Sequence, residues 1–135
     1  MEELNVGFVA FSPMANGFLS GKYGKGVQFD KKYDYRSNMS QFTDEAVEQN
    51  RELLALLNEM AENKNATPAQ ISMAWMLCKK PWIVPIPGTR KLDRLQENAK
   101  AAEIKLTDVE VKALDQMEMS EVFGGSKIVK KQEVN

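Results

Sequence analysis

The residues best placed to bind a ligand follow a short apolar run. Pro87 and Gly88 break this run, and Arg90, Lys91 and Arg94 come next, in what the pattern predicts as the first turns of a helix. Free backbone N–H groups and the positive end of the helix dipole attract anions at such a turn, and a guanidinium can hold a phosphate through two parallel hydrogen bonds. Two interpretations follow: a site for a phosphate-bearing ligand, or an ordinary strand-to-helix turn with a solvated basic surface, which is a common pattern.

The chain contains no histidine, and Cys78 is its only cysteine. A nucleophile activated by histidine, a histidine-ligated metal, a disulfide within the chain and a thiolate metal cluster are therefore all excluded. Any proton transfer would depend on carboxylate, lysine or tyrosine side chains. We predict no metal site, and we expect Cys78 to be a small core residue on the apolar face of a helix.

Length and charge limit the class of protein. A chain of 135 residues forms at most one domain, and a composition of 43% hydrophobic and 27% charged residues is that of an ordinary globular protein. The net charge of −1 gives no electrostatic attraction to nucleic acid or to an anionic membrane. No apolar run approaches the roughly 20 residues of a membrane span, and the acidic start Met1-Glu2-Glu3-Leu4 is unlike a signal peptide. We predict a cytoplasmic protein with no nucleic-acid or membrane partner.

Two short, continuously apolar segments are typical of strands buried on both faces, as in a parallel sheet. They cover residues 5–11 and 82–86, and a glycine-rich loop at 17–42 follows the first. Threonines at three helix starts are predicted caps, two of them followed three residues later by Gln or Glu. The predicted helices cover 43–63, 67–80, 91–102 and from 107 onward.

Apolar residues recur at helical spacing within three of these helices, which predicts one buried face on each. Because two parallel strands cannot bury both faces and both edges of a sheet, the chain is predicted to be a piece of a larger α/β fold. We expect residues 1–120 to form the folded part and residues 121–135 to form an irregular tail. The expected inward residues are Val47, Leu53, Leu54, Leu57, Met60 and Ala61 in the first helix, Ile71, Ala74, Trp75 and Cys78 in the second, and Val111, Leu114 and Met117 in the last.

Two linked motifs carry a family resemblance. Residues 6–22 (VGFVAFSPMANGFLSGK) and 83–98 (IVPIPGTRKLDRLQEN) closely resemble the C-terminal part of the aldo-keto reductases, and the likeness runs from about Glu2 to Gln116. The resemblance implies an α/β fold, namely the C-terminal fragment of a (β/α)8 TIM barrel. Two parallel strands, the seventh and eighth of the barrel, would be accompanied by about four helices and a long loop after the first strand.

The same resemblance implies a cofactor, NADP(H), because barrels of this kind bind phosphate at the loops after strands seven and eight. The basic residues after the second strand favour NADP over NAD, since the 2′-phosphate requires positive charge. By resemblance, one set of residues would line the pyrophosphate and ribose: Ser12, Pro13, Met14, Asn16, Gly17 and Leu19. A second set would hold the 2′-phosphate and reach the adenine: Gly88, Thr89, Arg90, Arg94, Glu97 and Asn98.

Aldo-keto reductases use a tetrad of Asp, Tyr, Lys and His, in which the tyrosine is the general acid for hydride transfer from the nicotinamide. The resemblance places these residues on the first to fourth strands, so we expect no catalytic residue here. The chain would be the C-terminal portion of an NADPH-dependent reductase of aldehydes or ketones, active together with the missing N-terminal half-barrel. The alternatives are a non-catalytic nucleotide-binding or protein-interaction remnant of a truncated gene, and a chain that self-associates through uncovered apolar surfaces.

The loop at 22–36 alternates cations with aromatic rings. The resemblance implies a lid that folds over the cofactor pyrophosphate, and a mobile solvated loop is the alternative. A nucleic-acid surface would use the same residue types, but no wider basic surface supports it. The cations are Lys22, Lys25, Lys31, Lys32 and Arg36, and the rings are Tyr23, Phe29, Tyr33 and Tyr35.

Overall fold

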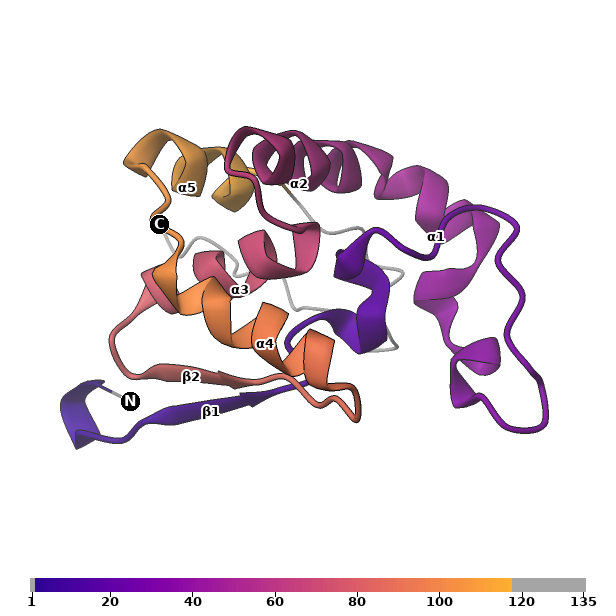
Figure 1. The fold of residues 1–135 in the computed structure, drawn as a ribbon, viewed down its shortest axis with the longest axis horizontal. Coiled ribbons are helices and arrows are strands. Elements are labelled where there is room, and N and C mark those ends of the chain that lie inside the picture. The colour runs from indigo at the N-terminus through magenta and orange to yellow at the C-terminus, as the bar shows by residue number, and fades with distance from the viewer. Residues whose placement is uncertain (1, 118–135) are drawn as a thin grey trace, which may run out of the picture.

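The computed structural model describes residues 2–117, in which a parallel pair of strands runs along one side (Figure 1). Strand β1 (Phe8–Phe11) pairs with β2 (Ile83–Ile86), with Phe8 opposite Ile83. The polypeptide between them forms the crossover that parallel pairing requires. Both predicted strands are confirmed, each slightly shorter than the apolar run that indicated it. The expected irregular tail at 121–135 lies outside the described residues.

Within residues 2–117 there are five α-helices, three of them in the crossover and two after β2, together with several short 3₁₀ turns. Three of the four predicted helices are present with bounds that differ from the expected ones by a few residues, and the segment expected as one helix at 43–63 forms two. The α-helices are α1 (Asp44–Gln49), α2 (Arg51–Asn63), α3 (Pro68–Lys79), α4 (Leu92–Lys100) and α5 (Asp108–Asp115). The 3₁₀ turns are η1 (Glu2–Leu4), η2 (Ala15–Ser20), η3 (Tyr35–Asn38), η4 (Ser40–Phe42) and η5 (Ala101–Glu103).

The three predicted threonine caps are confirmed. The Thr43 hydroxyl accepts a hydrogen bond from the backbone N–H of Ala46 at the start of α1. Thr67 and Thr107 form complete capping boxes at the starts of α3 and α5, in which the side chain of the third helical residue accepts from the threonine N–H. Each box satisfies two backbone donors that a helix start otherwise leaves free.

The single helix expected at 43–63 is wrong, because Asn50 divides it into α1 and α2. Asn50 is buried and leaves helical geometry, with φ −98° and ψ 13°. Its side-chain Nδ2 donates to the carbonyl of Ala46 at 2.8 Å. An asparagine side chain that bonds the backbone in this way competes with the regular helix ladder, which explains the break.

The hydrophobic core lies between η2 and helices α2, α3 and α5. Phe18 and Ile71 have no exposed surface, and Leu57 and Leu114 pack in the same cluster. The predicted inward stripe of the first helix is confirmed. The expectation that Cys78 is a core residue is wrong, because Cys78 is exposed in the last turn of α3.

Within the described residues the strands are not buried on both faces, which agrees with the expectation that two parallel strands alone cannot bury a sheet. Phe11 retains 83% of its exposure, Val9 61% and Val84 53%. In Figure 1 the five α-helices all lie to one side of the two-stranded sheet, and within residues 2–117 no element covers the other side or pairs with either outer edge. The apolar runs therefore form strands whose burial requires partners beyond those described. None of the helices in this region is long and apolar enough to cross a membrane.

Candidate functional site

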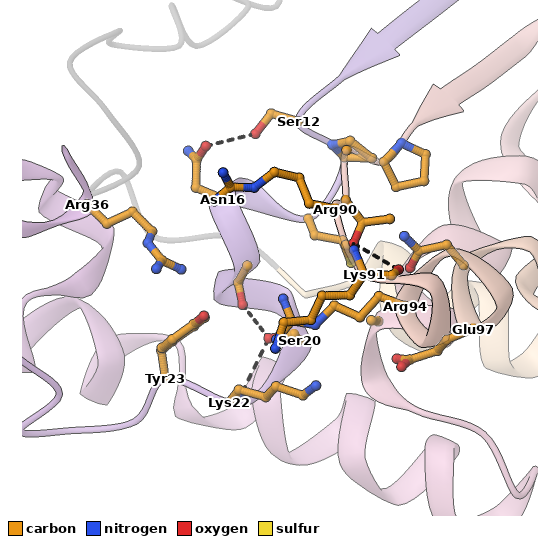
Figure 2. A pocket seen from close by; sticks show the side chains of 18 of the residues that line it. Ser12, Asn16, Ser20, Lys22, Tyr23, Arg36, Arg90, Lys91, Arg94 and Glu97 are labelled. Carbon is orange, nitrogen blue, oxygen red and sulfur yellow. Dashed lines mark hydrogen bonds between the residues drawn. The ribbon is translucent and has the colours of Figure 1, made fainter. Parts of the chain in front are cut away.

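A pocket of about 830 Å³ opens where both strands end (Figure 2). The turn after β1, the turn after β2, the start of α4 and the loop before η3 line it. Eleven of the twelve residues expected at a cofactor site lie on its walls: Ser12, Pro13, Met14, Asn16, Gly17, Gly88, Thr89, Arg90, Arg94, Glu97 and Asn98. The exception is Leu19, whose side chain packs into the hydrophobic core.

The turn after β1 has an unusual backbone. Ser12, Ala15 and Asn16 have positive φ angles of 50°, 47° and 58°, and Gly17 follows with φ 96°. Left-handed geometry at non-glycine residues is costly and persists where surrounding contacts enforce it. Here the fully buried Phe18 anchors the next residue, so the turn is held in place to present polar groups to the pocket.

Asn16 is the polar centre of that turn. Its Oδ1 accepts hydrogen bonds from the Ser12 hydroxyl at 3.2 Å and from the Tyr35 hydroxyl at 3.1 Å. The second bond joins the turn after β1 to Tyr35, the first residue of η3, nineteen residues further along the chain. The two segments therefore form one continuous wall.

The opposite wall is cationic and belongs to the segment between β2 and α4. Figure 2 shows Arg90, Lys91 and Arg94 following one another along this wall, with Glu97 at its far end from Arg90. Lys91 occupies the cap position of α4 but provides no side-chain cap, and its own N–H donates to the Thr89 hydroxyl at 3.2 Å. The first-turn N–H groups of α4 are thus without a side-chain acceptor and can bind an anion.

The charges of the pocket are unbalanced. Its walls carry five cationic side chains and two carboxylates, whereas the whole chain has a net charge of −1. Within residues 2–117, Lys22, Arg90, Lys91 and Arg94 form no ion pair. Four unpaired cations facing one cavity attract anions, and low dielectric walls strengthen that field.

The fifth cation, Arg36, is already paired. Its guanidinium donates to both carboxylate oxygens of Asp34, at 2.8 Å from Nε and 2.5 Å from Nη2. It also lies over the rings of Tyr23 and Phe29, at 4.8 and 4.5 Å from their centroids. The hydrogen bonds from Arg36 hold the pKa of Asp34 below its ordinary value. This pair therefore shapes the wall and leaves the anion-binding charge to the other four cations.

Glu97 is joined to the start of α3. Its Oε1 accepts a hydrogen bond from the Thr67 hydroxyl at 2.7 Å, and its backbone carbonyl accepts from Gln70 Nε2 at 2.8 Å. Ala69, from the same first turn of α3, also lines the pocket. Nothing in the residue pattern indicated this contribution of α3, because it arises from two helices that pack together.

Several residues of the loop at 22–36 also line the pocket. The resemblance implied that this loop is a lid over the cofactor pyrophosphate, and that role stays a prediction. The structure brings Lys22, Tyr23, Tyr33, Asp34, Tyr35 and Arg36 to the pocket wall, together with Ser20, Ile86, Pro87 and Lys91 from nearer segments. The remaining loop cations Lys25, Lys31 and Lys32 do not line it. In the described part of the chain, carboxylate and thiolate groups form no cluster of three or more that could hold a metal ion.

Parallel strands joined by helices, with a pocket at their carboxyl ends beside a helix N-terminus, define part of an α/β barrel of the TIM type. The chain belongs to the aldo/keto reductase family, whose family model matches residues 1–119. The expected family and fold class are both confirmed.

Curated relatives match over most of the chain. It is 39% identical to the aldo-keto reductase str7 of Strobilurus tenacellus and 35% identical to the aldo-keto reductase yakc [NADP(+)] of Schizosaccharomyces pombe, each over 123 residues. Each alignment covers 90% of this chain and 36% of the relative. The chain therefore spans about a third of the length of these relatives.

Solved structures are also matched over about a third of their length. The glycerol dehydrogenase AKR11B4 from Gluconobacter oxydans is similar with a TM-score of 0.74 at 26% identity, covering 84% of this chain and 34% of that one. The thermostable aldo-keto reductase Tm1743, solved with the inhibitor epalrestat, is similar with a TM-score of 0.54 at 32% identity, covering 84% and 30%.

Proposed function

We propose that the pocket binds the adenosine-phosphate end of NADP(H), and that the 2′-phosphate lies against Arg90 and Arg94. The observation that carries the proposal is the set of unpaired cations beside the uncapped start of α4. The uncharged 2′-hydroxyl of NAD(H) does not require cationic partners, whereas the 2′-phosphate of NADP(H) does. One relative, yakc, bears NADP(+) in its name, which supports the same cofactor.

The residues present fit this group. A volume of about 830 Å³ lies within the range of pockets that take molecules of cofactor size. Guanidinium groups bind phosphate oxygens through parallel hydrogen bonds, and the backbone N–H groups of α4 add further donors. The turn at 12–17 faces these cations, where its polar groups can contact a pyrophosphate and ribose.

When bound, NADP(H) supplies the hydride for carbonyl reduction. The residues of this chain bind and orient its phosphate-bearing end, and we assign none of them a proton-transfer role. Reduction of an aldehyde or ketone to an alcohol is proposed for the complete barrel of the family. A cytoplasmic location stays a prediction from composition.

The exposed sheet supports a proposal about the rest of that barrel. Val9 and Phe11 of β1 and Val84 and Ile86 of β2 are half or more exposed, and both outer edges of the pair are open within residues 2–117. We propose that the six remaining β/α units cover this sheet and complete the site. The alternative proposal, a non-catalytic nucleotide-binding remnant, needs only the pocket.

Binding of the cofactor is tested by fluorescence titration of the chain with NADPH and NADH. Arg90→Ala should weaken NADPH binding about tenfold to a hundredfold, since a hydrogen bond to a charged group contributes about 1.5–3 kcal/mol, and should leave NADH binding nearly unchanged. Arg51→Ala is the matched control, because Arg51 at the start of α2 pairs with Glu48 of α1 and does not line the pocket. Equal affinity for NADPH and NADH in the wild type would show that the phosphate site is wrongly placed.

Assembly is tested by mixing this chain with a polypeptide of the first six units of a family barrel. Sedimentation should show a complex, and an aldehyde panel with NADPH should show turnover that neither part has alone. A complex without turnover would favour the non-catalytic alternative.

A further inference from the structure

Arg94 and Glu97 are spaced to form an ion pair, yet they do not. They lie three residues apart on α4, a separation at which opposite charges on a helix surface are neighbours. Neither side chain takes part in an ion pair within residues 2–117. Instead, a carboxylate oxygen of Glu97 accepts the hydrogen bond from the Thr67 hydroxyl at 2.7 Å.

The position of Thr67 is fixed from several directions. Its hydroxyl accepts from the N–H of Gln70 at 3.3 Å, and its own N–H donates to Gln70 Oε1 at 3.0 Å. The buried Gln70 also donates to the backbone carbonyl of Glu97. A hydroxyl has one hydrogen to donate, and here that hydrogen is directed at the Glu97 carboxylate. Thr67 therefore both caps α3 and fixes the position of the Glu97 side chain on α4.

We propose that Thr67 is a positioning residue that keeps Glu97 from pairing with Arg94 and so leaves Arg94 available to a ligand phosphate. This inference rests on the proposed function. Without the hydroxyl, the carboxylate gains the freedom to neutralise its neighbour on the helix, and a phosphate meets one fewer available cation. Selectivity for the 2′-phosphate depends, on this view, on a threonine outside the set of pocket-lining residues.

The chain offers a matched control in Thr107. It caps α5 with the same box, in which its hydroxyl accepts from Glu110 N–H at 3.3 Å and its N–H donates to Glu110 Oε2 at 2.7 Å. Thr107 does not line the pocket. Glycine is nearly as good a helix cap as threonine, so Thr67→Gly and Thr107→Gly are both expected to fold.

The test measures the affinity ratio between 2′,5′-ADP and AMP by calorimetry, since only the first probe carries the 2′-phosphate. Thr67→Gly should lower this ratio about two- to fivefold, the size expected for one exposed ion pair that competes with the ligand. Thr67→Ser keeps the hydroxyl and should restore the wild-type ratio, and Thr107→Gly should leave it unchanged. Adding Glu97→Gln to Thr67→Gly should also restore it, because the neutral amide cannot pair with Arg94.

The outcomes separate this inference from the proposed function. A wild-type ratio of one would refute the 2′-phosphate site itself. A clear wild-type preference that Thr67→Gly leaves intact would refute the positioning role while the site stands. If Thr67→Gly lowers the affinity ratio and adding Glu97→Gln does not restore it, the positioning role is also refuted. The effect of Thr67→Gly would then not depend on the Glu97 carboxylate.

Discussion

Gly17 connects the backbone of the β1 turn to the aromatic wall of the pocket, so Gly17→Ala should damage both stability and binding. The residue has φ 96°, and a Cβ added there would lie 2.9 Å from Tyr23 Cε2. The Tyr23 ring cannot retreat freely, because it packs against Phe29 and Phe42 with centroids 5.3 and 5.8 Å away and lies under Arg36.

Two costs add up in this variant. An L-residue in left-handed geometry costs about 1–2 kcal/mol. Forcing extra volume into a packed site typically adds about 1–3 kcal/mol. Gly26→Ala isolates the first cost, because Gly26 has φ 79° with no atom within 4 Å of the added Cβ. Gly24→Ala has neither a positive φ nor a contact and should be neutral or slightly stabilising.

Urea unfolding followed by tryptophan fluorescence measures these differences. At a slope of about 1–3 kcal/mol per molar urea, Gly17→Ala should unfold at a midpoint about 1 M below that of Gly26→Ala. NADPH affinity should fall in Gly17→Ala only, because Tyr23 lines the pocket. Equal midpoints for these two variants would refute the steric argument, and equal midpoints for all three glycine variants would refute the backbone argument as well.

Three further outcomes follow from the packing and charges described. Arg36 lowers the pKa of Asp34 in the folded chain. The stability that this pair contributes is therefore present above the pKa of unfolded Asp34 and is lost as pH falls through the pKa of folded Asp34. Asp34→Asn should flatten this loss in urea midpoints measured between about pH 6 and pH 3. Phe18→Ala should cost about 3–5 kcal/mol in the same unfolding assay, because Phe18 is fully buried, and a cost below 1 kcal/mol would contradict its place in the core. Cys78 should react with Ellman's reagent in the native chain as fast as in urea, because it is exposed at the end of α3; a protected thiol would refute that exposure.

Features that depend on neighbouring residues were predictable from the sequence. The caps at Thr43, Thr67 and Thr107 and the basic turn after β2 are set by residues within one or two helical turns. The parallel strands were predictable because short, continuously apolar segments that alternate with helices are typical of parallel strands.

Features that depend on tertiary packing were not predictable. Cys78 has the helical spacing of a core residue, but its exposure depends on where the neighbouring elements end. The break at Asn50 depends on a side-chain bond that competes with the helix ladder. The bond between Thr67 and Glu97 joins residues thirty positions apart, and no local pattern encodes it.

Among residues 2–117, the fully buried core contains no strand side chain. Among the residues described, every buried apolar group comes from the helices, the 3₁₀ turns and their connections. Separating the two strands would therefore remove little of the apolar burial that holds the helices together. The sheet can open without unfolding of the helices. The pocket lies at the boundary between these two layers, since Ile86 of β2 and residues of α4 both line it. The shape of the pocket consequently depends on whether the two strands are paired. A ligand bound there would stabilise the paired sheet, so that the sheet and the helices would unfold together.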